Sequence, residues 1–228
     1  MAGKQSWRNL LFLHWPVPVD ELRPLVPQEL TLDPFDGQVW VGLVPFRMHA
    51  VHPSWLPEKL ALDFLECNLR TYVVYKDLPG VYFFSLDASS RLAVWAARLG
   101  WSLPYFYAQM RESTADQKIR YQVKRTNRAR LDLTYRVGDE LPASKPGSPE
   151  FFFLERYLLF SKRRGQMRCG QVHHMPYPAN SAEVLAIDDG LISAAGLSQP
   201  AGPPTYAHWS PGVDVEVFEL KANPASSP

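Results

Sequence analysis

Prolines are spread along the whole chain and leave little room for long helices. The sequence contains 21 prolines among 228 residues, nearly twice the usual share of about 5%. Each proline removes a backbone N–H donor and disrupts the interior of a helix, so only short helices fit between them. We therefore predict one α+β domain over residues 1–221, mainly β, with residues 222–228 as a frayed tail.

Alternating apolar residues indicate where the strands of this domain run. We expect strands near 7–15, 38–49, 64–75, 81–86, 103–110, 118–124, 131–137, 156–160, 165–173, 183–187 and 213–220. Gly42 and Pro45 interrupt the second of these strands, which predicts a bend or bulge. Ser148 and Pro149 are typical of a helix start, and Asp188 or Asp189 would cap a further helix that ends near residue 195.

The segment from Val81 to Met110 predicts a buried strand, a helix and a second strand. Asp87 and Ser89 are candidate N-caps, because their side-chain oxygens can accept the first free N–H groups of a helix. Leu92, Trp95, Ala96 and Leu99 recur at helical spacing, and Gly100 is a plausible stop. Arg91 and Arg98 are seven residues apart and share one stripe of this helix.

Composition excludes several classes of function. The formal net charge of +1 gives no overall field for nucleic acid or an acidic membrane. No apolar run approaches the roughly 18 residues that a membrane span needs. Two cysteines are too few for a disulfide framework or a zinc site, so we expect a cytoplasmic protein. We interpret the N-terminal apolar stretch as the first strand and not as a signal peptide.

Other patterns in the sequence give no sign of a nucleic-acid, metal, nucleotide or nucleophile site. The basic run from Arg125 to Arg130 is interpreted as a solvated hairpin end. His173 and His174 are adjacent in a predicted strand and would point to opposite faces, so we expect no metal site. Neither a Gly-rich phosphate loop nor a nucleophile motif around Ser85 is present. We therefore expect no cofactor.

One predicted strand carries polar residues on a single side. Glu66, Asn68, Arg70 and Tyr72 alternate with apolar residues and should share one face. If that face lines a pocket, Glu66 supplies an acid/base carboxylate and Arg70 an anion clamp. The alternative is a cross-strand salt bridge.

Arg98 and Tyr105 form the second candidate pair. An arginine can hold a carboxylate through two hydrogen bonds, and a buried tyrosine hydroxyl needs a polar partner. The alternative is that Arg98 pairs with an acidic group of the protein and Tyr105 belongs to the core. Asp87 is interpreted as a helix cap and not as a catalyst.

Several longer stretches resemble the YqjF-like family of uncharacterised bacterial proteins. They are FLHWPVP at Phe12, FDGQVWVGLVPFRM at Phe35, NLRTYVVY at Asn68, GVYFFSLDASSRLAVWAAR at Gly80, LPYFYAQM at Leu103 and FFLERYLLF at Phe152. The family resembles acetoacetate decarboxylase in fold, which implies a curved antiparallel sheet or β-barrel with a few short helices and a central pocket.

The resemblance to acetoacetate decarboxylase fails at the residues that perform its chemistry. That enzyme carries a Gly-Arg-Glu segment followed by Pro-Lys-Lys. Arg98 and Pro104 match, but Leu99 replaces the glutamate, and Tyr105 and Phe106 replace the two lysines. Neither replacement can form an imine, so we predict that this chain is not an acetoacetate decarboxylase.

These observations favour a protein that binds a small organic acid or a ketone-like metabolite. Arg98 would hold the anionic group, Tyr105 would hydrogen-bond a carbonyl or enol oxygen, and Glu66 would move a proton. The alternative is a non-catalytic ligand-sensing or assembly module, in which exposed tryptophans such as Trp55 or Trp209 form a homo-oligomer surface.

Overall fold

The computed structural model describes residues 2–55, 57–100 and 103–221. The strands are β1 (Gly3–Val17), β2 (Thr31–Leu32), β3 (Val39–Pro53), β4 (Leu62–Tyr75), β5 (Leu78–Ala88), β6 (Tyr105–Ala115), β7 (Lys118–Arg125), β8 (Arg130–Glu140), β9 (Leu158–Arg163), β10 (Gln166–His173), β11 (Asn180–Asp189) and β12 (Tyr206–Val217). The helices are α1 (Val19–Leu22), α2 (Arg91–Gly100), α3 (Pro149–Leu154) and α4 (Leu191–Ala194), with 3-10 turns η1 (Arg23–Leu25) and η2 (Glu58–Leu60).

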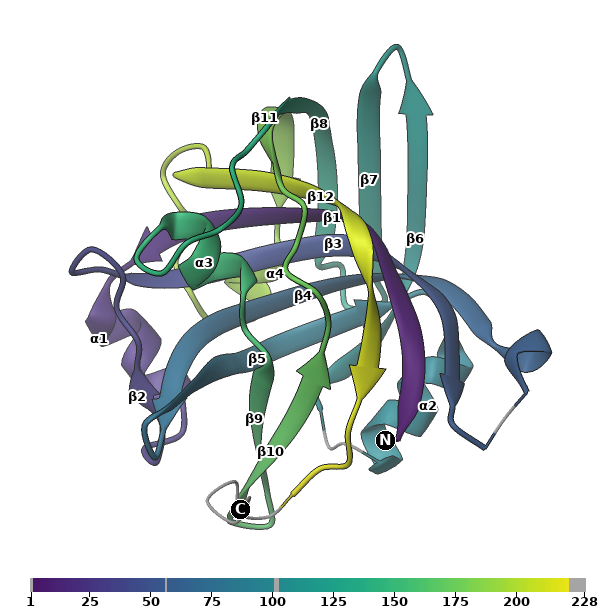
Figure 1. Ribbon diagram of the computed structural model, residues 1–228. Helices are drawn as coiled ribbons and strands as arrows, with labels where there is room; N and C mark the ends of the chain where they lie inside the picture. Colours follow the sequence, from purple (N-terminus) through teal and green to yellow (C-terminus); the bar gives the residue numbers. More distant parts are fainter. Residues whose placement is uncertain (1, 56, 101–102, 222–228) are drawn as a thin grey trace.

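The strands form one strongly curved sheet (Figure 1). Its order is β10-β9-β5-β6-β7-β8-β11-β12-β1-β3-β4-β2, and the extra pairings β4–β5 and β10–β12 bring the sheet back on itself. Most neighbours are antiparallel, and β5 runs parallel to β6 and to β9. The prediction of a mainly β, curved sheet with short helices is confirmed.

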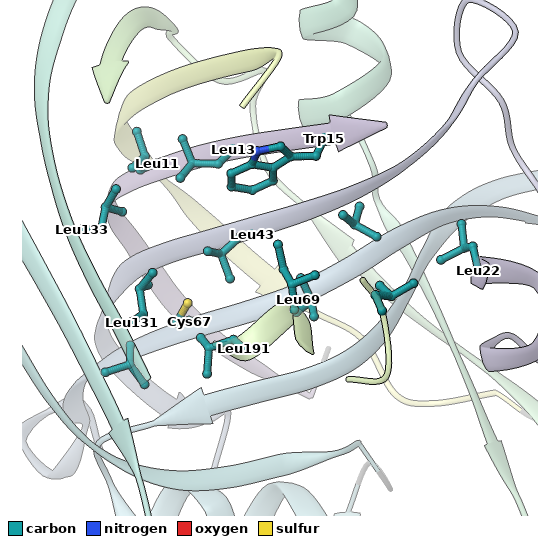
Figure 2. Packing of buried hydrophobic residues seen from close by; sticks show 14 of the residues in the cluster. Leu11, Leu13, Trp15, Leu22, Leu43, Cys67, Leu69, Leu131, Leu133 and Leu191 are labelled. Atoms are coloured by element: carbon teal, nitrogen blue, oxygen red, sulfur yellow. The ribbon is translucent and has the colours of Figure 1, made fainter. Parts of the chain in front are cut away.

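The strands β1, β3 and β4 contribute side chains to two separate hydrophobic cores, one on each face of the sheet. This follows because successive side chains of a strand point to opposite sides. On the face that we call the packed face, Leu11, Leu43 and Leu69 join a dense cluster that also holds Cys67 and Leu133 (Figure 2). The second cluster, on what we call the cavity face, includes the following side chains of the same strands: Leu10, Phe12, Trp40, Val44, Phe46, Met48, Phe64 and Tyr72.

The bulge beside Pro45 lies in β1 and not in β3, where the sequence predicts a bend or bulge at Gly42 and Pro45. The strand β3 pairs with β4 without a register shift from Val41 to Met48. The register of β1 against β3 shifts between the pairs Arg8–Arg47 and Leu13–Leu43, an interval that includes Pro45. Asn9, on the opposing strand, has a positive φ of 53°. An extra residue in one strand twists and curves the sheet locally, which helps β1 and β3 to wrap around the interior.

The helix caps partly differ from the prediction. Ser148 accepts a hydrogen bond from the N–H of Phe151 and caps α3, as expected. Asp189 likewise accepts from the first N–H groups of α4. Asp87, however, does not cap α2: it lies in β5, and Ser90 accepts from the N–H of Ala93 in its place.

In the described part of the chain, no helix is long and apolar enough to cross a membrane.

Candidate functional site

A cavity of about 560 Å³ lies on the cavity face of the sheet. Its walls come from β1, β3, β4, β5 and β9 together with α2, and most of the lining side chains are apolar. The lining includes Leu10, Phe12, Val44, Phe46, Met48, Leu62, Phe64, Val81, Leu86, Ala93, Ala96, Leu103, Leu154, Leu159 and Val172. Trp55 and Leu60 also line it and are largely exposed, so the cavity opens to solvent beside them.

The polar residues predicted on one side of β4 face this cavity. Glu66, Asn68 and Arg70 all line it, and their side chains are buried. Leu65, Cys67 and Leu69 alternate with them and belong to the core on the packed face. The sequence pattern therefore placed these three polar residues correctly along one strand.

Glu66 and Tyr105 are in direct contact within the cavity wall. The Tyr105 hydroxyl donates a hydrogen bond of 3.0 Å to Oε2 of Glu66, and both residues are buried. Burial of the carboxyl raises the pKa of Glu66 to about 8, although the Tyr105 hydrogen bond acts in the opposite direction. At neutral pH the carboxyl is therefore mostly protonated and can donate a proton.

Arg70 is a buried cation at the same cavity. Its Nη2 donates a 2.9 Å hydrogen bond to the backbone oxygen of Phe153, and its guanidinium lies 5.6 Å from the ring centroids of Phe12 and Tyr72. Among the described residues, no carboxylate forms an ion pair with it, and its Nε has no hydrogen-bond partner. Asn68 Oδ1, two residues away, also has no partner there.

The two residues at the expected lysine positions point in different directions. Tyr105 faces the cavity, whereas the ring of Phe106 lies 4.4 Å from the guanidinium carbon of Arg125. Arg125 forms a buried ion pair with Asp87, with one contact of 2.7 Å between Nη2 and Oδ2. The interpretation of Arg125 as part of a solvated turn is therefore wrong.

The sequence did contain a signal for the burial of Arg125. It continues the alternation of Tyr121 and Val123, which are both buried on one side of β7. Arg156, by contrast, lines the cavity but forms an ion pair with Asp33 at 2.7 Å. Its own positive charge is therefore already balanced within the protein.

The side chain of Arg98 lies outside the described part of the structure, although its helix α2 contributes Ala93, Ala96 and Ala97 to the cavity wall. His174 packs against aromatic rings and its Nδ1 contacts the backbone oxygen of Met175. Across the described residues, no group of three or more His, Cys, Asp or Glu side chains could hold a metal ion.

Solved structures with this fold are known. An acetoacetate decarboxylase from Legionella pneumophila matches with a TM-score of 0.66 at 12% identity, covering 99% of this chain and 90% of that one. An acetoacetate decarboxylase-like enzyme from Sphingomonas wittichii RW1 matches with a TM-score of 0.63 at 12% identity, covering 97% and 92%. The enduracididine biosynthesis enzyme MppR, complexed with pyruvate, matches with a TM-score of 0.61 at 13% identity, covering 96% and 88%. These similarities establish the acetoacetate decarboxylase-like fold.

Sequence comparison gives the family. YqjF of Bacillus subtilis (strain 168), an uncharacterized protein, is 38% identical over 221 residues, which cover 96% of this chain and 91% of that protein. Residues 4–214 match the family DUF2071, described as an uncharacterized conserved protein. With nearly the whole chain matched, this protein belongs to the DUF2071 family and is a relative of YqjF.

Proposed function

We propose that the cavity binds a small organic acid or a ketone-like metabolite, with Arg70 as the anion-binding group. The observation that carries the proposal is a buried arginine without a carboxylate partner among the described residues. A buried charge is costly unless something pairs with it. A ligand carboxylate beside Arg70 would supply that partner and would also accept from the unpartnered Nε.

Glu66 gives this site a proton to donate. Its pKa of about 8 keeps the carboxyl protonated at neutral pH. Because Tyr105 donates to Oε2, the carboxyl proton is left on Oε1. In the proposed reaction this proton passes to a carbonyl or enolate oxygen of the ligand, and the resulting carboxylate keeps the Tyr105 hydrogen bond.

An imine mechanism is not part of the proposal. Among the described residues that line the cavity, Lys4 is the single lysine, and it is exposed. A lysine nucleophile needs burial or a neighbouring cation to lower its pKa. Pyruvate, which MppR binds, is therefore a useful probe: incubation with pyruvate and borohydride should leave the protein mass unchanged. A lysine adduct would contradict the proposal.

The direct test is a binding screen of the purified protein against small carboxylates, keto acids and neutral ketones. A ligand that binds the folded state raises the melting temperature by mass action. We expect carboxylates to stabilise the protein and Arg70→Met to weaken their binding by roughly 10- to 100-fold, as expected for the loss of a charged hydrogen bond.

Arg47→Met is the matched control for this test. Arg47 lies on the neighbouring strand β3, outside the cavity, and its half-exposed side chain pairs with Glu112. The Arg47→Met variant should bind the same carboxylates as the wild type. If Arg47→Met and Arg70→Met weaken binding equally, or if only neutral compounds bind, Arg70 is not the anion-binding group.

The runner-up is an assembly module, favoured by exposed tryptophans. Trp55 is 80% exposed and Trp95 is 63% exposed, whereas Trp209 is partly buried against the core on the packed face. Self-association through Trp55 and Trp95 would bury the exposed surfaces of these two side chains. Sedimentation of the wild type and of the Trp55→Ala variant tests it: a dimer that the substitution dissociates would favour this role.

A further inference from the structure

We propose that the ligand is not a three- or four-carbon acid but an amphipathic acid whose long apolar chain runs from the polar residues of β4 to the opening beside Trp55. This inference deepens the proposed function and rests on it. Three independent features carry it: the volume of the cavity, its length along β4 and the exposed apolar side chains at its opening.

The cavity is much larger than a three- or four-carbon keto acid would fill. It holds about 560 Å³, and a non-hydrogen atom takes up about as much room as a liquid water, roughly 30 Å³. The volume thus accommodates about 19 non-hydrogen atoms. A four-carbon keto acid would leave more than half of it empty or wet, between walls that are mostly apolar.

The lining also extends along most of one strand. Leu62, Phe64, Glu66, Asn68 and Arg70 of β4 all contribute to it. At about 3.3 Å per residue, the eight steps from Leu62 to Arg70 span roughly 26 Å. The polar residues occupy the inner half of this path and the apolar residues the outer half. Such a division matches a ligand with one polar end and one apolar end.

The outer half of the cavity ends at apolar side chains that the protein leaves in water. Trp55, Leu60 and Leu92 are 80%, 55% and 58% exposed, and all three line the cavity. They are three of the eight large apolar side chains that the described residues leave exposed. An apolar chain that leaves the cavity at this point would cover them, which a short acid cannot do.

The test is calorimetric titration with straight-chain carboxylates of four, eight, twelve and sixteen carbons, kept below their micelle concentrations. Burial of each added methylene should tighten binding roughly three- to fourfold, until the cavity is full. The twelve-carbon alcohol should bind at least tenfold more weakly than the twelve-carbon acid, because it lacks the charge that Arg70 pairs with.

Two variants locate the chain within the cavity. Ala96→Trp adds a large side chain from the exposed surface of α2 into the lining. It should remove binding of the twelve-carbon acid and leave the four-carbon acid unaffected. Trp95→Ala changes the adjacent residue, which is exposed but does not line the cavity, and it should bind both acids as the wild type does.

The outcomes separate the two proposals. Equal affinity for all chain lengths, lost in Arg70→Met, would overturn the long-chain inference and leave the organic-acid function standing. A rise in affinity with chain length that is the same for acids and alcohols would overturn the role of Arg70. If Ala96→Trp and the wild type bind the twelve-carbon acid equally, the chain does not pass α2 and the inference fails.

Discussion

Arg70 and Arg125 are buried on opposite faces of the central sheet, and they differ in what balances their charge. Arg125, on the packed face, is 5% exposed and pairs with the fully buried Asp87. Arg70, on the cavity face, is 9% exposed and has no carboxylate partner among the described residues. Both guanidinium groups also lie near aromatic rings, so their apolar surroundings are similar.

The difference separates a structural ion pair from a candidate binding group. Removing one member of a buried pair leaves an uncompensated charge, which makes Arg125 and Asp87 important for stability. The charge of Arg70 faces a cavity of 560 Å³ in which a ligand can approach it. Substitution of Arg70 should therefore affect binding more than folding, and substitution of Arg125 should affect folding first.

The largest expected effect comes from breaking the pair on the packed face. Arg125→Met leaves Asp87 buried without a partner and should lower the free energy of unfolding by about 3–5 kcal/mol. The double variant Asp87→Leu/Arg125→Met should recover most of this loss. Arg70→Met should cost no more than about 1 kcal/mol. Urea unfolding of all three variants measures these changes, and equal losses for Arg70→Met and Arg125→Met would contradict the comparison.

Leu10 and Leu11 offer a matched test of packing on the two faces. They are adjacent in β1 and both buried, but Leu10 lines the cavity and Leu11 lies in the packed cluster. Leu11→Ala should cost about 2–5 kcal/mol, because a new void forms in a dense core. Leu10→Ala only enlarges an existing cavity and should cost at most about half as much. Equal losses in urea unfolding would mean that the cavity face is packed as tightly as the other.

The elements of the sheet were predictable because their signals are local. Alternation along β4 was sufficient to place Glu66, Asn68 and Arg70 on one side, and Ser148 with Pro149 was sufficient to start α3. What each side faces depends on strands far apart in the chain. That Arg70 would lie unpaired in a cavity, and Arg125 paired with Asp87, follows from contacts between β4, β5 and β7 that no local pattern encodes.

The α2 helix illustrates the same limit. Its apolar spacing predicted the helix correctly, but Leu92 and Trp95 are exposed while Val94 is buried. Helical spacing identifies a stripe of residues and does not reveal whether the stripe meets a core, a cavity or solvent. The position of Asp87 just before the helix in sequence predicts a cap, whereas the strand β5 continues through this residue.

The protonation of Glu66 makes a pH-dependent prediction. Its pKa is raised from 4.5 to about 8 in the folded state, so the unfolded chain releases this proton at a lower pH than the folded chain. The free energy of unfolding should therefore fall as the pH rises from about 5 to 8. Each unit of pKa difference is worth about 1.4 kcal/mol, so even half of this difference lowers the free energy of unfolding by about 2 kcal/mol.

Glu66→Gln isolates this contribution, because glutamine keeps a hydrogen-bond acceptor for Tyr105 but does not titrate. The variant should gain about 2 kcal/mol relative to the wild type between pH 5 and pH 8. Urea unfolding at several pH values measures the difference, in which the titration of the histidines cancels. A constant difference across this range would mean that Glu66 is already ionised in the folded protein.

The smallest effect is expected from Tyr105→Phe, and it is the most direct probe of the pair. Loss of the 3.0 Å hydrogen bond should cost about 1 kcal/mol of stability. Because this bond favours the ionised carboxylate, its loss should also raise the pKa of Glu66 above about 8. A carboxyl titration followed by NMR measures the shift.

Tyr107→Phe, two residues along β6 and outside the cavity lining, should leave the pKa of Glu66 unchanged. If both variants shift it alike, or if Tyr105→Phe lowers it, the hydroxyl does not act on Glu66 as a donor, and the proton proposed for catalysis would have to be positioned by another group.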